Sequence, residues 1–419
     1  MTRPSRHHAL LALALFATAC DDRDIGPLPI PAIETPVRFA VRHSDFSNTS
    51  ISLLDDTGAI LADDYITSGA TRPGLTLAIG GDTDMPTVSE PGVLTIIDRY
   101  GSDVVTRIRL ADGIVLGQVR TQGESNSGFS SNPQDVLVID RDSAWVSRYS
   151  HNTMTPVVGD VRGSDLLGVD PSTMTRTNGR IDLVTLEETV DSFGTEMRAR
   201  ARPKKIVRVG NFAAVGVDLI TDDYSVAAPG KLAIVDVRNG ALSSVDLPDF
   251  TNCGNLAPVP GNETYVAVMC QGYNYPNREA ESGLVIVSID PVVGTVTEIR
   301  RYATADYLDE DYVFDAFEMI DEDEFVGIHL GGYRVTDPPD SLVHVRMVDG
   351  SRTTLFTSEK GSQLFVEPAF DPSTGLLLVP DTSAGVRRFQ RGEDGSFTQG
   401  ELIVLVGHGL PTRAVALLR

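Results

Sequence analysis

Short apolar runs rich in Val, Ile and Leu recur along this chain, and most of them end in aspartate. Each run opens after Gly, Ser or Pro and precedes a turn and another apolar stretch. No segment between the runs keeps a helical period over ten residues. The pattern therefore predicts β-strands in a repeated unit. Five clear repeats and two weaker ones lie at residues 51–55, 94–98, 166–170, 232–236, 285–290, 342–347 and 386–389.

Hairpins are predicted between these strands. The clear ones lie at 136–147, 205–219, 256–270, 314–329 and 365–379, and a poor one lies at 75–80. The last hairpin has only one strand, at 413–418, so we expect residues 38–42 to supply its neighbour and close the ring. The chain is thus predicted to be all-β, a single seven-bladed β-propeller of four-stranded antiparallel blades over residues 36–419.

Two segments resemble a known family. Residues 230–236 read Gly-Lys-Leu-Ala-Ile-Val-Asp, and Asn239-Gly240 follows them, which is similar to the strand and turn of YVTN-repeat, surface-layer-like bacterial propellers. Residues 265–268 (Tyr-Val-Ala-Val) stand where that family has Tyr-Val-Thr-Asn. The resemblance implies the architecture only, because propellers of similar shape include binding modules, lactonases and quinoproteins.

The N-terminus carries the pattern of an export signal. Arg3 and Arg6 precede an apolar stretch at 9–16 that is too short to span a bilayer, and residues 17–19 (Ala-Thr-Ala) lead directly to Cys20. This arrangement resembles the lipobox of bacterial lipoproteins, which implies that Cys20 is lipidated and becomes the mature N-terminus. An ordinary secretory signal cut near the same alanine is the alternative.

The lipobox resemblance divides the chain into a signal peptide (1–19), a tether rich in Pro and Asp (20–35) and the propeller (36–419). On this interpretation the protein is an exported bacterial lipoprotein of the periplasm or cell surface. The lipid is then its only attachment to the inner or outer membrane.

Composition narrows the classes of function. Hydrophobic residues make up 41% of the 419, which is typical of a globular chain. Asp and Glu number 58 against 35 Lys and Arg, and a net charge of −23 argues against a nucleic-acid partner. The three cysteines and few scattered histidines form no metal motif, so we expect no metal cofactor, and we expect a monomer.

Cys253 and Cys270 flank one predicted hairpin. If residues 261–262 form its two-residue turn, the register places the two cysteines opposite each other. An oxidising environment outside the cytoplasm favours a disulfide between them. The alternative is two buried free thiols.

The long connections are predicted to share one face of the disc, since alternate connections of antiparallel strands lie on opposite faces. They lie at 121–133, 151–163, 187–203, 221–229, 271–282, 303–311 and 331–340. Six tyrosines in or beside them form the candidate binding face, with rim packing as the alternative role: Tyr224, Tyr273, Tyr275, Tyr307, Tyr312 and Tyr333.

An acidic run lies on the same predicted face. Its residues are Asp306, Asp309, Glu310, Asp311 and Asp315. Oxygen ligands suit Ca²⁺, but the run lacks the spacing of a calcium loop, so a solvated acidic loop is the favoured interpretation over bound Ca²⁺.

One short segment of this acidic chain is rich in basic residues, and we call it the basic strip. The strip begins with three arginines that alternate with alanine: Arg198, Arg200 and Arg202. Lys204, Lys205 and Arg208 follow. Pairing with neighbouring acidic loops is the favoured interpretation. A docking site for an acidic polysaccharide, a lipid headgroup or a protein is the alternative.

Catalytic motifs are absent: the chain contains no nucleophile elbow, P-loop, dinucleotide fingerprint or His-Glu-x-x-His sequence. We therefore expect a non-catalytic binding or scaffolding module for an envelope protein or glycan. The alternative is an exported hydrolase of lactonase type with a site at the propeller axis. Candidate contributors to such a site are Asp82, Asp84, Arg148, His151 and Asp218.

Overall fold

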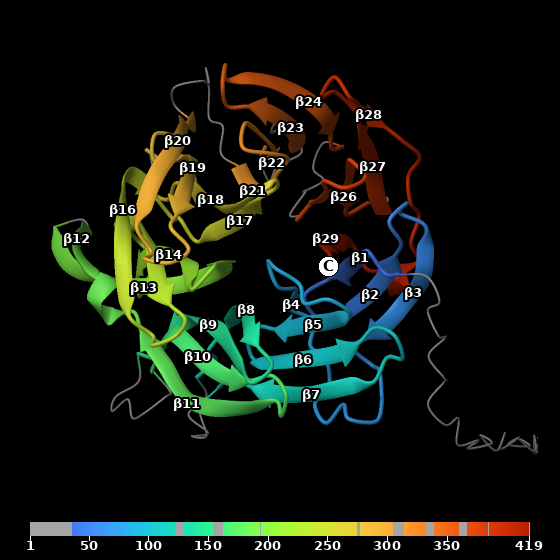
Figure 1. Ribbon diagram of the computed structural model, residues 1–419, viewed down its shortest axis with the longest axis horizontal. Coiled ribbons are helices and arrows are strands. Elements are labelled where there is room, and N and C mark those ends of the chain that lie inside the picture. The colour runs from blue at the N-terminus through green and yellow to red at the C-terminus, as the bar shows by residue number, and fades with distance from the viewer. Residues whose placement is uncertain are drawn as a thin grey trace, which may run out of the picture.

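The structure is a computed structural model that describes residues 36–418, apart from 123–128, 154–161, 193, 275–276, 305–313, 332–338, 360–366 and 384. Across this part of the chain, seven antiparallel sheets stand in a ring around a common axis (Figure 1). The predicted all-β, seven-bladed propeller is confirmed. Cys20, with the predicted signal peptide and tether, lies outside the described residues.

The first three blades contain the following strands in sheet order. Blade 1 contains β29 (Thr412–Leu417), β1 (Phe39–Ser44), β2 (Thr49–Leu54) and β3 (Ile60–Thr67). Blade 2 contains β4 (Thr83–Asp84), β5 (Val93–Asp98), β6 (Val104–Arg109) and β7 (Val115–Arg120). Blade 3 contains β8 (Pro133–Asp140), β9 (Ser143–His151), β10 (Gly163–Asp170) and β11 (Thr175–Asp182).

The remaining four blades complete the ring. Blade 4 contains β12 (Glu188–Ser192), β13 (Thr195–Val209), β14 (Phe212–Thr221), β15 (Pro229–Asp236) and β16 (Leu242–Thr251). Blade 5 contains β17 (Asn255–Val259), β18 (Asn262–Gln271), β19 (Ser282–Ile289) and β20 (Val296–Ala303). Blade 6 contains β21 (Phe314–Met319), β22 (Glu324–His329), β23 (Ser341–Arg346) and β24 (Ser351–Thr357). Blade 7 contains β25 (Ala369–Asp371), β26 (Leu376–Asp381), β27 (Gly385–Arg391) and β28 (Phe397–Gln399).

Helical structure is limited to short turns in the described residues. Two of these are the 3₁₀ turns η2 (Val184–Leu186) and η3 (Gly407–Gly409). No helix in this part of the chain has the length and apolarity needed to cross a bilayer.

The ring closes by pairing strands from the two ends of the described chain. β1 pairs with β29 in an antiparallel register that runs from Phe39↔Leu417 to Arg42↔Ala414, and β1 pairs with β2 on its other edge. The predicted partnership of the 38–42 and 413–418 segments is therefore confirmed. Blade 1 contains strands from both termini, and in Figure 1 β29 lies beside β1 next to the axis.

Each blade is buried on both faces because it packs between two neighbours. In β15, Leu232 and Ile234 belong to the apolar cluster shared with blade 5, whereas Ala233 and Val235 belong to the cluster shared with blade 3. Successive side chains of a strand point to opposite faces, so a strand with two buried faces needs an uninterrupted apolar run. This explains why the repeats read as continuous hydrophobic stretches.

Most of the Asp-ended runs have the same place in their blades: they are the third strand, after the hairpin with which the blade begins. Blade 2 is the exception: residues 94–98 lie in β5, the second strand, and no strand forms at 75–80. Gly74, Gly80 and Gly81 make this segment a poor strand, and the innermost strand β4 has only two residues.

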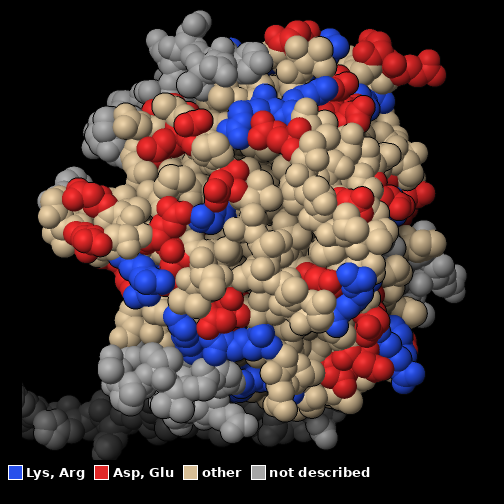
Figure 2. Space-filling view, turned by 60° about the vertical axis from the view of Figure 1, so that its left-hand side comes forward, with Lys and Arg blue, Asp and Glu red and all other residues tan. Residues whose placement is uncertain are grey.

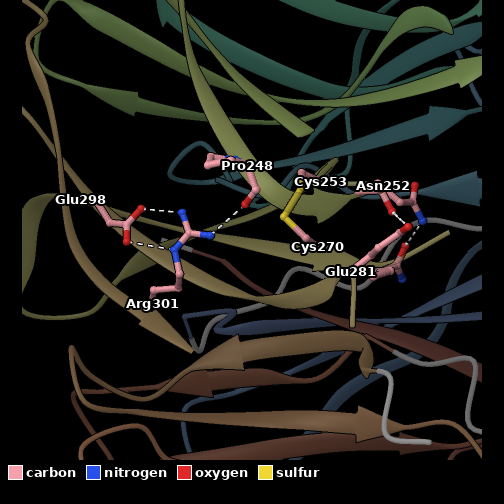
Figure 3. The surroundings of a disulfide bond; sticks show 9 residues. Pro248, Asn252, Cys253, Cys270, Glu281, Glu298 and Arg301 are labelled. Carbon is pink, nitrogen blue, oxygen red and sulfur yellow. Dashed lines mark hydrogen bonds and ion pairs between the residues drawn. A yellow bond between two sulfur atoms is a disulfide. The ribbon is translucent and has the colours of Figure 1, made fainter. Parts of the chain in front are cut away.

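The disulfide between Cys253 and Cys270 is present, and both residues are fully buried (Figure 3). The strand register differs from the predicted one, because Asn255 pairs with Met269 and a bulge at Val259 shifts the turn. Cys253 lies just before β17 and forms an isolated bridge with Val217 of blade 4. The disulfide therefore secures the chain where it passes from blade 4 into blade 5.

Candidate ligand-binding face

The strand order places the long connections on one face. They join the second strand of a blade to the third, or an outermost strand to the innermost strand of the next blade. We call this side the long-loop face. Innermost strands start there and second strands end there, so residues at those ends meet at the mouth of the axis.

The insertion at 187–203 is a hairpin and not an irregular loop. β12 pairs with the first half of β13, from Glu188↔Ala199 to Ser192↔Thr195, and the hairpin projects from the rim of the ring (Figure 1). From Ala199↔Thr221 to Val209↔Phe212, β13 pairs with β14 as the innermost strand of blade 4. A register shift between Pro203 and Ile206 interrupts this pairing.

Lys205 lies at that register shift and forms ion pairs with residues of two other blades. Its Nζ lies 3.1 Å from Oδ2 of Asp84, at the end of β4 in blade 2, and 3.8 Å from Oε1 of Glu367, which precedes β25 in blade 7. The side chain of Lys205 is only 11% exposed. A cation from blade 4 thus joins carboxylates from blades 2 and 7 at the mouth of the axis.

Asp84 is the most strongly perturbed carboxylate of this cluster. Burial would raise its pKa, but Lys205, Arg42 and Arg99 hold the pKa well below its ordinary value. Arg99 also donates to Oδ1 of Asp82 at 2.5 Å. Burial likewise opposes the charge of Lys205, and Asp84, Glu367 and Asp135 hold the pKa of Lys205 well above its ordinary value. The pair is therefore ionised throughout the neutral range.

Asp135 joins three blades through backbone hydrogen bonds. Its Oδ1 accepts from the Thr87 N–H at 3.1 Å, and its Oδ2 accepts from the Ile206 N–H at 2.7 Å. Burial raises the pKa of Asp135 to about 6, although Lys205 and the Ile206 N–H favour the charged form. The carboxylate has no solvent exposure, so its role is to position the inner strands of blades 2 to 4.

The charged groups at the axis therefore satisfy one another. Among the described residues, no group of three or more His, Cys, Asp or Glu side chains could hold a metal ion. Asp84 and Glu367 both form ion pairs with Lys205, and the charge of Asp135 also raises the pKa of this lysine.

A second structured region of this face surrounds Arg202. Its guanidinium carbon lies 4.5 Å from the ring centroid of Tyr224 and 5.6 Å from that of Tyr149. Nη2 of Arg202 reaches Oδ1 of Asp222 at 3.5 Å. The Tyr273 hydroxyl donates to the Tyr224 carbonyl at 2.8 Å. We call these five residues the Arg202 stack.

The Arg202 stack joins an exposed ring to a buried polar interior. Tyr224 is 50% exposed, whereas Arg202 is almost completely buried. Burial raises the pKa of Tyr149 well above its ordinary value, and the neighbouring Asp218 raises it further. Burial also raises the pKa of Asp218, with Lys204 opposing the shift. Asp218 is therefore a buried partner of Tyr149 at the base of the stack.

The other predicted axial residues have structural partners. Arg148 is fully buried and donates to both carboxylate oxygens of Asp165, at 2.7 and 2.6 Å, and to the Thr121 carbonyl at 2.9 Å. Burial lowers the pKa of His151, and Arg200 lowers it further. Of the predicted axial set, Asp82 and Asp84 meet at the axis, whereas Arg148, His151 and Asp218 lie on or beside second strands further out.

Arg198, Arg200 and Arg202 of the basic strip lie against acidic partners from their own blade. Glu187 Oε2 lies 2.5 Å from Nε of Arg198 and 3.1 Å from Nη1 of Arg200, and Asp222 contacts both Arg200 and Arg202. Figure 2, which brings the β12 side of the ring forward, shows Lys and Arg side chains lying against Asp and Glu side chains. The strip is not an isolated basic surface on this side.

Four candidate tyrosines, Tyr275, Tyr307, Tyr312 and Tyr333, lie outside the described residues, as do residues 306–311 of the acidic run. Sequence reasoning missed the axial roles of Lys205, Asp135, Glu367 and Arg99. Asp135, Glu367 and Arg99 each lie within a few residues of the long-loop end of a first or second strand, and that position was the available signal for them. Lys205 lies inside β13 at a register shift, which no sequence pattern indicated.

The fold and this face define the class of protein: a seven-bladed β-propeller with a polar axial mouth. A scan of protein-family models and a search of curated proteins each found no match. Among solved structures, the chain is similar to the Pseudomonas aeruginosa periplasmic gluconolactonase PpgL (TM-score 0.55, 12% identity, 91% of this chain and 99% of that chain). It is also similar to a candidate 6-phosphogluconolactonase of Bacteroides uniformis (TM-score 0.54, 11% identity, 91% of this chain and 99% of that chain). A third similar structure is the β-propeller domain of Cps50 from Myceliophteria thermophila (TM-score 0.54, 12% identity, 85% of this chain and 95% of that chain). These identities establish the shared fold alone.

Proposed function

We propose that this chain is a lipid-anchored propeller of the bacterial cell envelope, related to the YVTN-repeat propellers, whose long-loop face binds an envelope protein or glycan without catalysis. The observation that carries this proposal is the Arg202 stack. It holds Tyr224 half-exposed on that face, between a buried guanidinium and the hydroxyl of Tyr273. An aromatic side chain held rigid before binding loses little conformational entropy on contact.

The state of the axis supports a binding role. A catalytic carboxylate must be within reach of a substrate, yet Asp84 and Asp135 are both buried and already have partners within the protein. The exposed aromatic edge of the stack is available to a partner, whereas the axial carboxylates stabilise the ring.

Binding is tested with a photo-crosslinking residue placed beside Tyr224 in the full chain, in intact envelopes, followed by mass spectrometry. We expect a reproducible partner that is lost in Tyr224→Ser and retained in the control Tyr100→Ser, which removes a more exposed tyrosine outside the stack. Recovery of the same partner from Tyr224→Ser, or of no reproducible partner from the unmodified chain, contradicts the proposal.

Anchoring is tested separately by fractionation. Cys20→Ser is expected to move the protein from the membrane fraction to the soluble fraction, because a lipid would be its only membrane attachment. Retention of Cys20→Ser in the membrane fraction contradicts the lipoprotein assignment. The crosslinking result can be interpreted whether or not Cys20 is lipidated.

A lactonase-type hydrolase is the second candidate function. It is favoured by the convergence of Asp84, Asp135 and Glu367 on Lys205, and by solved neighbours that are named lactonases. The reaction adds water to a lactone and releases a hydroxy acid. The test is proton release from an aldonolactone in the presence of the purified chain. If the chain catalyses this release and the Asp84→Asn variant does not, the lactonase function replaces the binding proposal.

A further inference from the structure

The outermost strand of blade 7 continues beyond β28 as an apolar segment. Residues 402–406 read Leu-Ile-Val-Leu-Val, and we call them the rim segment. Ile403 pairs with Val386 of β27: each N–H donates to the carbonyl of the other residue at 2.9 Å. Further along, the Val406 N–H donates to Oδ2 of Asp63 on β3 at 2.7 Å. The rim segment therefore lies at the edge of the ring where blades 7 and 1 meet (Figure 1).

The side chains of the rim segment point alternately inward and outward, as in a strand. Ile403 and Leu405 are partly buried and pack against the apolar cluster shared by blades 7 and 1. Leu402, Val404 and Val406 point outward and are 39%, 68% and 70% exposed. Three apolar side chains in succession thus face the solvent along one side of this segment.

The backbone of the rim segment also has an open side. Because Ile403 directs both of its polar groups to β27, the polar groups of Leu402 and Val404 point away from the blade. Neither of these two N–H groups has a hydrogen-bond partner in the part of the chain that the structure describes. The rim segment is therefore a sheet edge with free hydrogen-bonding groups and an apolar face.

The outermost strands of the other six blades differ from the rim segment. Proteins commonly protect sheet edges against pairing with another chain by placing charged side chains on them. Each of these six strands carries at least one charged residue: Asp63 in β3, Arg120 in β7, Arg176 in β11, Asp246 in β16, Glu298 in β20 and Arg352 in β24. Residues 402–406 contain no charged residue and no proline, so this edge lacks that protection.

We propose that the rim segment pairs with the rim segment of a second copy of this chain, antiparallel and around a two-fold axis, so that two propellers form a dimer. With Ile403 on the axis, Leu402 of one copy lies opposite Val404 of the second copy, and the free polar groups of both residues bond to each other. Glu401 then lies opposite Leu405 of the second copy, so no like charges oppose each other in the paired segments.

This inference goes beyond the proposed function and is independent of it. Blade 4, which holds Tyr224, lies across the ring from the junction of blades 7 and 1 (Figure 1), so pairing of the rim segments leaves the Arg202 stack accessible. The dimer differs from the monomer expected from composition. A net charge of −23 opposes association, but salt screens that repulsion beyond about 8 Å at physiological ionic strength.

The test is sedimentation velocity of the purified full chain over a series of protein concentrations. Detergent micelles keep any lipid on Cys20 from joining two copies. The variant is Val404→Lys, which places a charge at the centre of the edge. The matched control is Val293→Lys, which places the same charge at a 67% exposed valine in the β19–β20 turn. Circular dichroism and urea unfolding verify that both variants are folded.

We expect a monomer–dimer equilibrium for the unmodified chain and for Val293→Lys, and association at least about tenfold weaker for Val404→Lys, because each dimer would bury two lysines. Higher salt should strengthen the dimer, since it screens the net charge. Hydrogen exchange of residues 402–404 should slow as the dimer forms.

Four results would overturn the proposal. These are a monomer at every concentration, equal association of Val404→Lys and the unmodified chain, species larger than a dimer, and unchanged hydrogen exchange of residues 402–404 when the dimer forms.

Discussion

Replacement of Lys205 by methionine tests whether ion pairs stabilise the mouth of the axis. At 3.1 Å and an effective dielectric constant of about 20, the attraction between Lys205 and Asp84 is roughly 5 kcal/mol. Removing one partner of a buried pair typically destabilises a protein by about 3–5 kcal/mol. Arg99 remains 3.9 Å from Asp84 in the variant. We therefore expect Lys205→Met to lower the free energy of unfolding by about 3 kcal/mol, near the lower limit of that range.

The assay is urea unfolding at neutral pH, followed by tryptophan fluorescence and circular dichroism. The double variant Lys205→Met with Asp84→Asn is expected to recover part of the loss, because it removes the uncompensated buried charge. The control is Lys231→Met: Lys231 pairs with Glu188 at 2.7 Å and Asp246 at 2.9 Å, but both carboxylates are well exposed. The control should lose only about 0–1 kcal/mol.

Equal losses for the two single lysine variants would refute this reasoning. So would a loss below about 1 kcal/mol for Lys205→Met with an unchanged denaturant slope, since the axial pair would then contribute no more than an exposed one.

Three further predictions concern stability. Alkylation of the mature protein without reductant should leave Cys253 and Cys270 unmodified, and two alkylated thiols would contradict the disulfide. Replacing both cysteines by alanine should lower the free energy of unfolding in urea by about 2–4 kcal/mol. Burial lowers the pKa of His43 from 6.5 to about 4, so its contribution to stability is present above pH 6.5 and is lost as the pH falls toward 4. The loss is up to about 3 kcal/mol, and His43→Gln should flatten that part of the pH–stability profile. Arg148→Met leaves Asp165 fully buried, with the partly exposed Arg180 as its one remaining ion-pair partner among the described residues. This variant should lose about 3 kcal/mol or more of unfolding free energy in urea, and a loss below about 1 kcal/mol would contradict a structural role.

The fold could be predicted from the sequence because the strands of a propeller leave a local pattern. In β15, Leu232 to Val235 face two different blades in alternation, so the strand must be apolar throughout, and a single window of sequence records this. Blade 2 was misassigned because β4 has only two residues and leaves almost no pattern. The sequence carries no direct signal for a strand so short.

The candidate site was less predictable, because the ring assembles it from distant segments. Lys205 and Asp84 are 121 positions apart and meet only because blades 2 and 4 both face the axis. In the sequence, Lys205 follows Arg198, Arg200 and Arg202 and was grouped with that basic strip. The register shift after Pro203 separates them, so that Lys205 faces the axis while Arg198 pairs with Glu187.

The pairing of β1 with β29 determines when this ring can be completed. Its partners Phe39 and Leu417 come from opposite ends of the described chain, so blade 1 remains a three-stranded sheet with an open edge until the last strand has been synthesised. An open edge of that kind pairs readily with other chains. A chain that stops before Thr412 would therefore contain six whole blades and still be prone to aggregate.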